Sequence, residues 1–190
     1  MVRFPKLVRR AASLFVSCVA FGTATSASAL SCVPWGVPDA YLAAANSNRS
    51  YAILQGRLSF DERRLPRPPA GNPNAAPPVT QFRGSFNGDL LGARDFDQAV
   101  RADVVIEVQC MGPWCGKAKS GVEYLIFAEQ RGRDLIVRFD PCGSFAVGGD
   151  VHSFRTQVLD CHRGQACFPL ALPSRPGPLR RPGAPASRMG

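Results

Sequence analysis

The sequence predicts a small all-β domain stapled by disulfides, with one or two short helices beside the sheet. Short segments of alternating apolar and polar residues dominate the chain, and glycine and proline separate them. An even number of cysteines follows a segment that has the pattern of an export signal. Without that signal and a proline-rich tail, about 140 residues remain, which is enough for one domain with its own core.

The first 29 residues have the features of a signal peptide. Basic residues precede an apolar run at 11–22, and Ala27-Ser28-Ala29 is a small-x-small cleavage site. The run is too short to span a membrane. We therefore expect cleavage after Ala29, a mature chain that begins at Leu30, no membrane span, and a secreted or periplasmic location.

Five segments are predicted to be strands, at 51–60, 79–86, 102–110, 124–129 and 134–140. In the third of these, one face carries Ala102, Val104, Ile106 and Val108, and the opposite, outer face carries Asp103, Glu107 and Gln109. Gly56 in the middle of the first strand indicates a bend or bulge.

Helices and a long loop are predicted around these strands. Pro38 is typical of the start of a helix over 38–47, with Tyr41, Leu42 and Ala45 facing inward, and Asp150 is a suitable cap for a helix over 151–161. Six prolines at 61–78 exclude a paired strand there, so we expect an exposed loop.

Five strands and a bend in the first one predict a five-stranded Greek-key barrel of the OB-fold type. The alternative is a β-sandwich, which usually needs about seven strands. The predicted domain covers 30–168, preceded by the signal at 1–29. A tail at 169–190, rich in proline and arginine, is expected to be disordered.

The net charge of +9 is concentrated at the two ends of the chain. Of the 23 basic residues, four lie in the signal and four in the tail, which leaves 15 against 14 acidic residues in the body. A nearly neutral body does not predict a nucleic-acid partner. The tail could make weak contact with an anionic surface.

Several short motifs occur in the order known from one family. They are Cys32-Val33-Pro34, Phe82-Arg83-Gly84, Cys115-Gly116, the pattern Gly121-x-x-Tyr124-Leu125, and Asp140-Pro141-Cys142. Together they resemble the netrin-like (NTR) domain, the OB-fold module shared with tissue inhibitors of metalloproteinases. The resemblance covers roughly 31–145 and implies an OB-type barrel that acts by binding.

The six cysteines outside the signal indicate three disulfides, and residue patterns alone leave about 15 pairings open. The resemblance implies a bridge from Cys32 to Cys142. Cys115 stands at the family's Cys-Gly position, but the family's first cysteine, its usual partner, is absent. The same comparison therefore implies Cys110 with Cys115, which leaves Cys161 with Cys167.

In the inhibitors of that family, the free amine and carbonyl of an N-terminal cysteine bind the zinc of the target enzyme. Leu30 occupies that place here. The resemblance therefore implies a partner-binding ridge, formed by Leu30, Ser31, Cys32, Val33 and Pro34, in which the Leu30 backbone chelates a target's zinc and Ser31 enters its cleft. In the alternative interpretation, the arm only pins the barrel, with Trp35 and Trp114 packed against it.

Catalytic chemistry is not predicted. The stretch "CMGPWCGK" contains parts of a thioredoxin motif, but four residues separate its cysteines where exchange needs two. Only His152 and His162 are available for a triad, and a zinc site at Cys161, His162 and Cys167 lacks a usual finger spacing. No cofactor fingerprint or resident metal site is apparent.

The expected function is that of an exported, non-catalytic binding protein, in its specific form an inhibitor of a zinc metalloproteinase. The alternative is an envelope or matrix interaction module that uses the barrel loops and the arginine-rich tail and inhibits no protease. A thiol-disulfide oxidoreductase is the third hypothesis.

Overall fold

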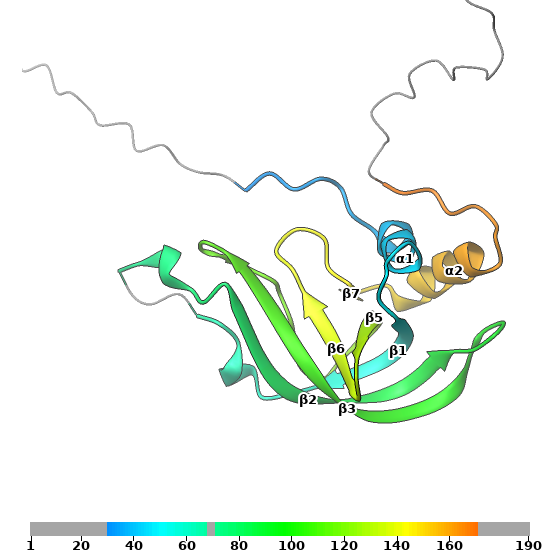
Figure 1. Cartoon of the computed structure of the whole chain (residues 1–190), viewed down its shortest axis with the longest axis horizontal. Helices are drawn as coiled ribbons and strands as arrows, with labels where there is room; N and C mark the ends of the chain where they lie inside the picture. The colour runs from blue at the N-terminus through cyan, green and yellow to red at the C-terminus, as the bar shows by residue number, and fades with distance from the viewer. Residues whose placement is uncertain (1–29, 68–70, 171–190) are drawn as a thin grey trace, which may run out of the picture.

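The computed structural model describes residues 30–67 and 71–170, and the predicted signal and most of the tail lie outside them. The chain is mostly β-sheet with two helices, as expected (Figure 1). The helices are α1 (Val37–Ala45) and α2 (Val151–His162). The strands are β1 (Tyr51–Ser59), β2 (Val79–Leu91), β3 (Phe96–Met111), β4 (Trp114–Cys115), β5 (Val122–Arg131), β6 (Asp134–Phe139) and β7 (Ala146–Gly148).

The strand pairings connect β1-β2-β3-β6-β5, and β5 in turn pairs with β1. These pairings are antiparallel except between β3 and β6, which run parallel from Val104 opposite Leu135 to Val108 opposite Phe139. The pairing of β5 with β6 is short and involves Glu129–Arg131 only. The short strand β4 pairs with the end of β3, and β7 pairs with β5.

All five predicted strands are present, but the expected number of five is wrong, because the described residues form seven strands, with the short strands β4 and β7 in addition. Strands β2 and β3 are also longer than expected. They continue as a hairpin whose far end lies beside α2, where the Arg155 guanidinium donates hydrogen bonds to Gln55 and Asp95. The same guanidinium stacks 5.1 Å from the centre of the Phe96 ring. This part of the hairpin is polar and lacks regular alternation, so tertiary contacts with α2 stabilise it.

The predicted loop at 61–78 is present, with two single 3-10 turns at Glu62–Arg64 and Pro73–Ala75.

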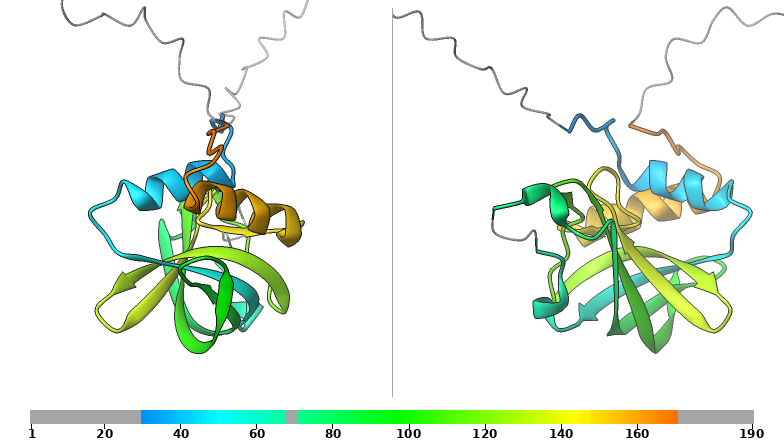
Figure 2. Two further views of the ribbon diagram at one scale, coloured as in Figure 1. Left: turned by 90° about the vertical axis from the view of Figure 1, so that its right-hand side faces the viewer. Right: turned by 60° about the vertical axis from the view of Figure 1, so that its left-hand side comes forward.

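Two apolar clusters lie on opposite faces of the sheet. One fills the space between the strands, and its fully buried members include Leu54, Leu58, Phe86, Val104, Ile106, Val108 and Phe139. The other joins β5 to the helices, which Figure 2 shows together on one side of the strands, and it includes Val37, Ala40, Leu125, Phe127 and Val158. Burying each of the valine, leucine, isoleucine and phenylalanine side chains among them contributes about 1.5–3 kcal/mol.

The two helices follow the prediction with one correction. Asp150 caps α2, because its Oδ1 accepts a hydrogen bond from the Ser153 backbone N–H at 3.2 Å. In α1, Tyr41 and Leu42 are half-buried, but the expectation that Ala45 faces inward is wrong, since Ala45 is exposed. The buried face of α1 is instead the one that carries Val37, Ala40 and Ala44.

Two glycines face each other where β1 passes β2. Gly56 pairs with Gly88, and a Cβ on Gly88 would lie 2.2 Å from the Gln55 carbonyl oxygen. A Cβ on Gly56 would lie 2.5 Å from the Asn87 carbonyl oxygen. The bend that Gly56 predicted is thus a close approach of two backbones, which no residue with a side chain would permit.

We expect Gly88→Ala to lower the free energy of unfolding by about 2 kcal/mol or more, because the new methyl group meets backbone atoms that cannot move aside. Gly132→Ala is the matched control. Its Cβ would meet open space at a φ of +61°, so only a backbone cost of about 1 kcal/mol is expected. Urea unfolding of both variants measures the difference, and equal losses would contradict the close approach.

Candidate functional site at the N-terminal arm

Residues 30–35 form an extended arm before α1, called the arm from here on. Ser31, Cys32, Val33, Pro34 and Trp35 are exposed, and Leu30 is half-buried. Two interactions hold the arm against the chain. Cys32 is bridged to Cys142 with Cα atoms 5.3 Å apart, and the Trp35 Nε1–H donates to the Ser144 carbonyl oxygen at 3.1 Å. The arm is therefore exposed and fixed at the same time.

The structure contains the three disulfides that the resemblance implies, Cys32–Cys142, Cys110–Cys115 and Cys161–Cys167. Cys110 and Cys115 are directly opposite each other in the β3–β4 hairpin, which turns at Gly112 and Pro113. In thiol-exchange enzymes the reactive cysteine stands at the start of a helix. Here both cysteines lie in strands, so this bridge has the position of a hairpin staple.

A cleft of about 620 Å³ separates the arm from this hairpin. Leu30 and Cys32 line it from the arm, and the loop after β6 contributes Asp140, Pro141, Gly143 and Ser144. The hairpin side consists of Pro113, Trp114, Cys115 and Lys117. We call it the arm cleft. A second cleft of about 360 Å³, lined by Val33 and Trp35 among others, also borders Cys32, so the Cys32–Cys142 bridge lies between two hollows.

Exposed apolar side chains lie on the arm and at the end of the hairpin, the two elements that flank the arm cleft. Val33 on the arm is 69% exposed, and Met111 and Trp114 at the hairpin end are 54% and 37% exposed. Exposed apolar groups gathered around a concave surface are typical of protein-binding sites. The arm and the hairpin end, Met111–Cys115, are together called the docking face below.

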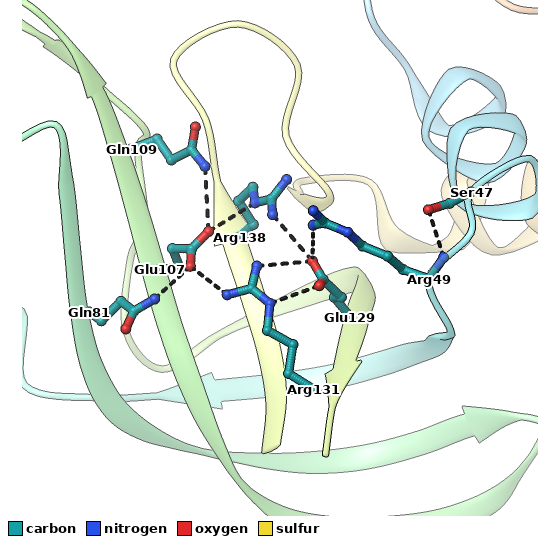
Figure 3. A network of polar contacts seen from close by, with 8 residues as sticks. All are labelled: Ser47, Arg49, Gln81, Glu107, Gln109, Glu129, Arg131 and Arg138. Atoms are coloured by element: carbon teal, nitrogen blue, oxygen red, sulfur yellow. Dashed lines mark hydrogen bonds and ion pairs between the residues drawn. The ribbon is translucent and has the colours of Figure 1, made fainter. Parts of the chain in front are cut away.

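A polar network lies on the outer side of β3, β6 and β5 (Figure 3). Its centre is two carboxylates, Glu107 and Glu129, whose side chains are only 6% and 8% exposed. Arg138 on β6 bridges them, at 3.1 Å to Glu107 and 3.2 Å to Glu129. Arg131 also reaches both, at 3.1 Å and 2.7 Å, and Arg49 donates to Glu129 at 2.9 Å.

Hydrogen bonds keep both carboxylates ionised. Burial acts to raise the pKa of Glu107, but hydrogen bonds from Gln81, Arg131 and Arg138 outweigh it and lower that pKa. The hydrogen bonds from Arg131 lower the pKa of Glu129 against a smaller opposing effect of burial. Glu107 was expected on the outer face, and it lies there, but its arginine and glutamine neighbours cover it.

The same network positions the loop that carries the arm cleft. Arg138 belongs to the network through its side chain, and its carbonyl oxygen accepts a hydrogen bond from the Ser144 hydroxyl at 3.0 Å. The same hydroxyl oxygen of Ser144 accepts a hydrogen bond from the Ala146 backbone N–H at 3.1 Å. This loop contains Asp140 and Cys142, so the network, the loop and the arm form one connected structure.

Asp140 is a half-buried acid in the wall of the arm cleft. Burial raises its pKa to about 6, with a further rise from the negative charge of Glu107 and an opposing effect of Arg138. In the sequence this residue appears only as part of the motif Asp140-Pro141-Cys142, and no pattern marks it as a site residue. It comes close to Leu30 only because the Cys32–Cys142 bridge joins positions that are far apart in the chain.

His152 and His162, the two histidines considered for a catalytic triad, lie at opposite ends of α2. His152 is exposed, whereas His162 is half-buried, with its Nδ1 3.3 Å from the Tyr41 hydroxyl and its Nε2 3.3 Å from the Ala93 carbonyl oxygen. Within residues 30–67 and 71–170 no group of three acidic, histidine or cysteine side chains could hold a metal ion. In the same ranges no helix is long and apolar enough to cross a membrane.

We expect Arg131→Ala to lower the free energy of unfolding by about 2–3 kcal/mol at pH 7, because two buried carboxylates lose a shared partner. Both glutamates have lowered pKa values in the folded state, so their contribution is present above about pH 4.5 and is lost as the pH falls below it. The difference between wild type and variant should therefore shrink at pH 3.

The matched control is Arg83→Ala, which removes the solvent-exposed ion pair of Arg83 with Asp134. Exposed pairs contribute at most about 1 kcal/mol. Chemical denaturation at both pH values measures the two variants. Similar small losses for Arg131→Ala and Arg83→Ala would contradict a stabilising role of the network.

No protein-family model, curated protein or solved structure matches this chain.

Proposed function

We propose that this chain is an exported, non-catalytic binding protein that recognises a protein partner through its docking face. The observation that carries the proposal is the arm, in which five consecutive residues are exposed although a disulfide and a tryptophan hydrogen bond fix them. A segment that is already ordered loses little conformational entropy on binding. Exposed apolar residues on the arm and at the hairpin end, Val33, Met111 and Trp114, supply the contact area.

We also propose that the sheet is an OB-type barrel. The pairings that lead from β1 through β2, β3, β6 and β5 back to β1 support this, as does the parallel pairing of β3 with β6. In such barrels one face of the second and third strands and two of the loops bind the ligand, and part of the docking face lies on the hairpin that continues β3.

The specific form of the proposal is inhibition of a zinc metalloproteinase. Leu30 would become the mature N-terminus, and its α-amine and carbonyl would chelate the zinc of the target, while Ser31 would enter the substrate cleft. The resemblance to NTR domains supports this, together with the position of Leu30 two residues before the bridged Cys32. An amine and a carbonyl in fixed geometry form a two-atom chelate.

We expect the mature protein, beginning at Leu30, to inhibit at least one member of a panel of zinc metalloproteinases. A form extended by one alanine should be at least about tenfold weaker, because the extension moves the amine away from the carbonyl that completes the chelate. Inhibition constants measured for both forms on the same enzymes give the comparison. Equal potency of the two forms would exclude chelation.

The second candidate is an envelope or matrix interaction module that needs no free amine. The exposed apolar end of the β3–β4 hairpin favours it, because Met111 and Trp114 are independent of the N-terminus.

For this candidate we expect Trp114→Ala to reduce binding of a partner, captured from the native secretome and then purified, by about tenfold or more, since buried tryptophans are frequent hot spots. The alanine-extended form and a form without 169–190 should bind normally. Arg101→Ala, on the remote part of β3, is the control. Retained binding by Trp114→Ala would remove the hairpin from the docking face.

A further inference from the structure

Asp140 has no hydrogen-bond partner among the described residues, although it lies half-buried in the arm cleft. The charges that act on it are Arg138, which belongs to the Glu107–Glu129 network, and Glu107 itself. Lys117 also lines the cleft, but it is exposed and forms no ion pair with Asp140. The site is therefore a carboxyl group placed at the wall of a cleft without a cation of its own.

The disulfide brings the start of the mature chain to this carboxyl group. Leu30 precedes Cys32 by two residues and Asp140 precedes Cys142 by two, and the Cα atoms of the bridged cysteines are 5.3 Å apart. Two residues of chain span at most about 7 Å, so Leu30 cannot move far from the bridge. Leu30 and Asp140 both line the arm cleft.

We propose that Asp140 is the binding site for the α-ammonium group that signal cleavage creates on Leu30. Cleavage after Ala29 hydrolyses the amide bond, so that water supplies the hydroxyl of a new Ala29 carboxyl group and a proton for the Leu30 nitrogen. At neutral pH that nitrogen takes up a further proton from solvent and becomes an ammonium ion. Before cleavage the same nitrogen is an uncharged amide, so the cation of this pair exists only in the mature chain.

The pairing is favourable because each partner offsets a cost of the other. A half-buried carboxylate is poorly solvated, and an ammonium ion in the same cleft restores an opposite charge. The bridge already restricts Leu30, so this pair loses less conformational entropy than a pair with the long side chain of Lys117. The pair would hold the arm against the loop that follows β6.

The proposal depends on the predicted cleavage and on no target enzyme. It does bear on zinc chelation, which requires the neutral amine. A carboxylate partner stabilises the ammonium form, so it opposes chelation. Asp140→Asn should accordingly strengthen any inhibition that the mature amine produces. If no protease is inhibited, the pair between Leu30 and Asp140 remains testable by itself.

The first experiment is a pH titration of the Asp140 side-chain carbon by NMR. It compares the mature protein, beginning at Leu30, with a form that retains Ala27, Ser28 and Ala29, and Asp140→Asn assigns the signal. We expect the pKa of Asp140 in the mature protein to be lower than in the extended form by about one unit or more, as an opposite charge at ion-pair distance produces. Equal pKa values in the two forms would overturn the proposal.

The α-amine gives an independent readout. After 13C-methylation, its pKa in the mature protein should exceed the usual value of about 8 and should fall back in Asp140→Asn. Lys117→Met distinguishes the two candidate cations. If this substitution, and not the N-terminal extension, raises the pKa of Asp140, then Lys117 is the partner and the proposal fails.

Stability supplies a double-mutant cycle that does not depend on assigning signals. At pH 7 the extension to Ala27 should lower the melting temperature of the wild-type sequence and leave that of Asp140→Asn unchanged. An equal decrease in both backgrounds would mean that the extension acts elsewhere, which would contradict the pair.

Discussion

The bridge between Cys32 and Cys142 is the constraint on which the docking face depends. It joins the start of the described chain to the end of β6 across 110 residues, and the strands from β1 to β6 lie within the loop that it closes. In the chain-entropy account, a loop of this length stabilises the folded state by about 4–5 kcal/mol. Its local effect is more specific, because it holds the six residues of the arm, five of them exposed, as a ridge with a cleft on either side.

The two buried glutamates, with their arginine partners, hold β6 in place on the outer face of the sheet. Glu107 lies on β3 and Glu129 on β5, and β6 with Arg138 lies between these strands. A shift of β6 by one residue would turn Arg138 to the other face of the sheet and away from both carboxylates, so the network favours the observed register of β6. Within the described residues, no buried side-chain nitrogen or oxygen lacks a hydrogen-bond partner. The network also holds the loop that follows β6, because the Ser144 hydroxyl donates a hydrogen bond to the carbonyl oxygen of Arg138.

The strands and both helices were predictable because alternation, proline and capping residues act locally. Val104, Ile106 and Val108 indicate a buried strand face wherever the rest of the chain lies. Contacts between residues that are far apart in the sequence could not be predicted from these local signals. Alternation places Glu107 on the outer face correctly, but only arginines from β5 and β6 bury it there. The hairpin beyond Asn87 likewise depends on Arg155 of α2.

In the candidate site, too, local signals were predictable and contacts between distant residues were not. The sequence predicts the arm, through its cysteine, its proline and the cleavage site before it. The opposite wall of the cleft combines Trp114 with Asp140, which come together through the strand topology. The pairing of the cysteines came from a family resemblance, since six cysteines by themselves leave many connectivities open.

The bridges are nested, because Cys110–Cys115 lies wholly within the loop that Cys32–Cys142 closes. A chain that crosses a membrane from its N-terminus exposes its cysteines in sequence order. Oxidation of each cysteine with the next would join Cys32 to Cys110 and Cys115 to Cys142, and only Cys161–Cys167 would be native. Production of the native protein in an oxidising compartment therefore requires Cys32 to stay reduced until β6 has emerged, or an isomerase that reshuffles the early pairs.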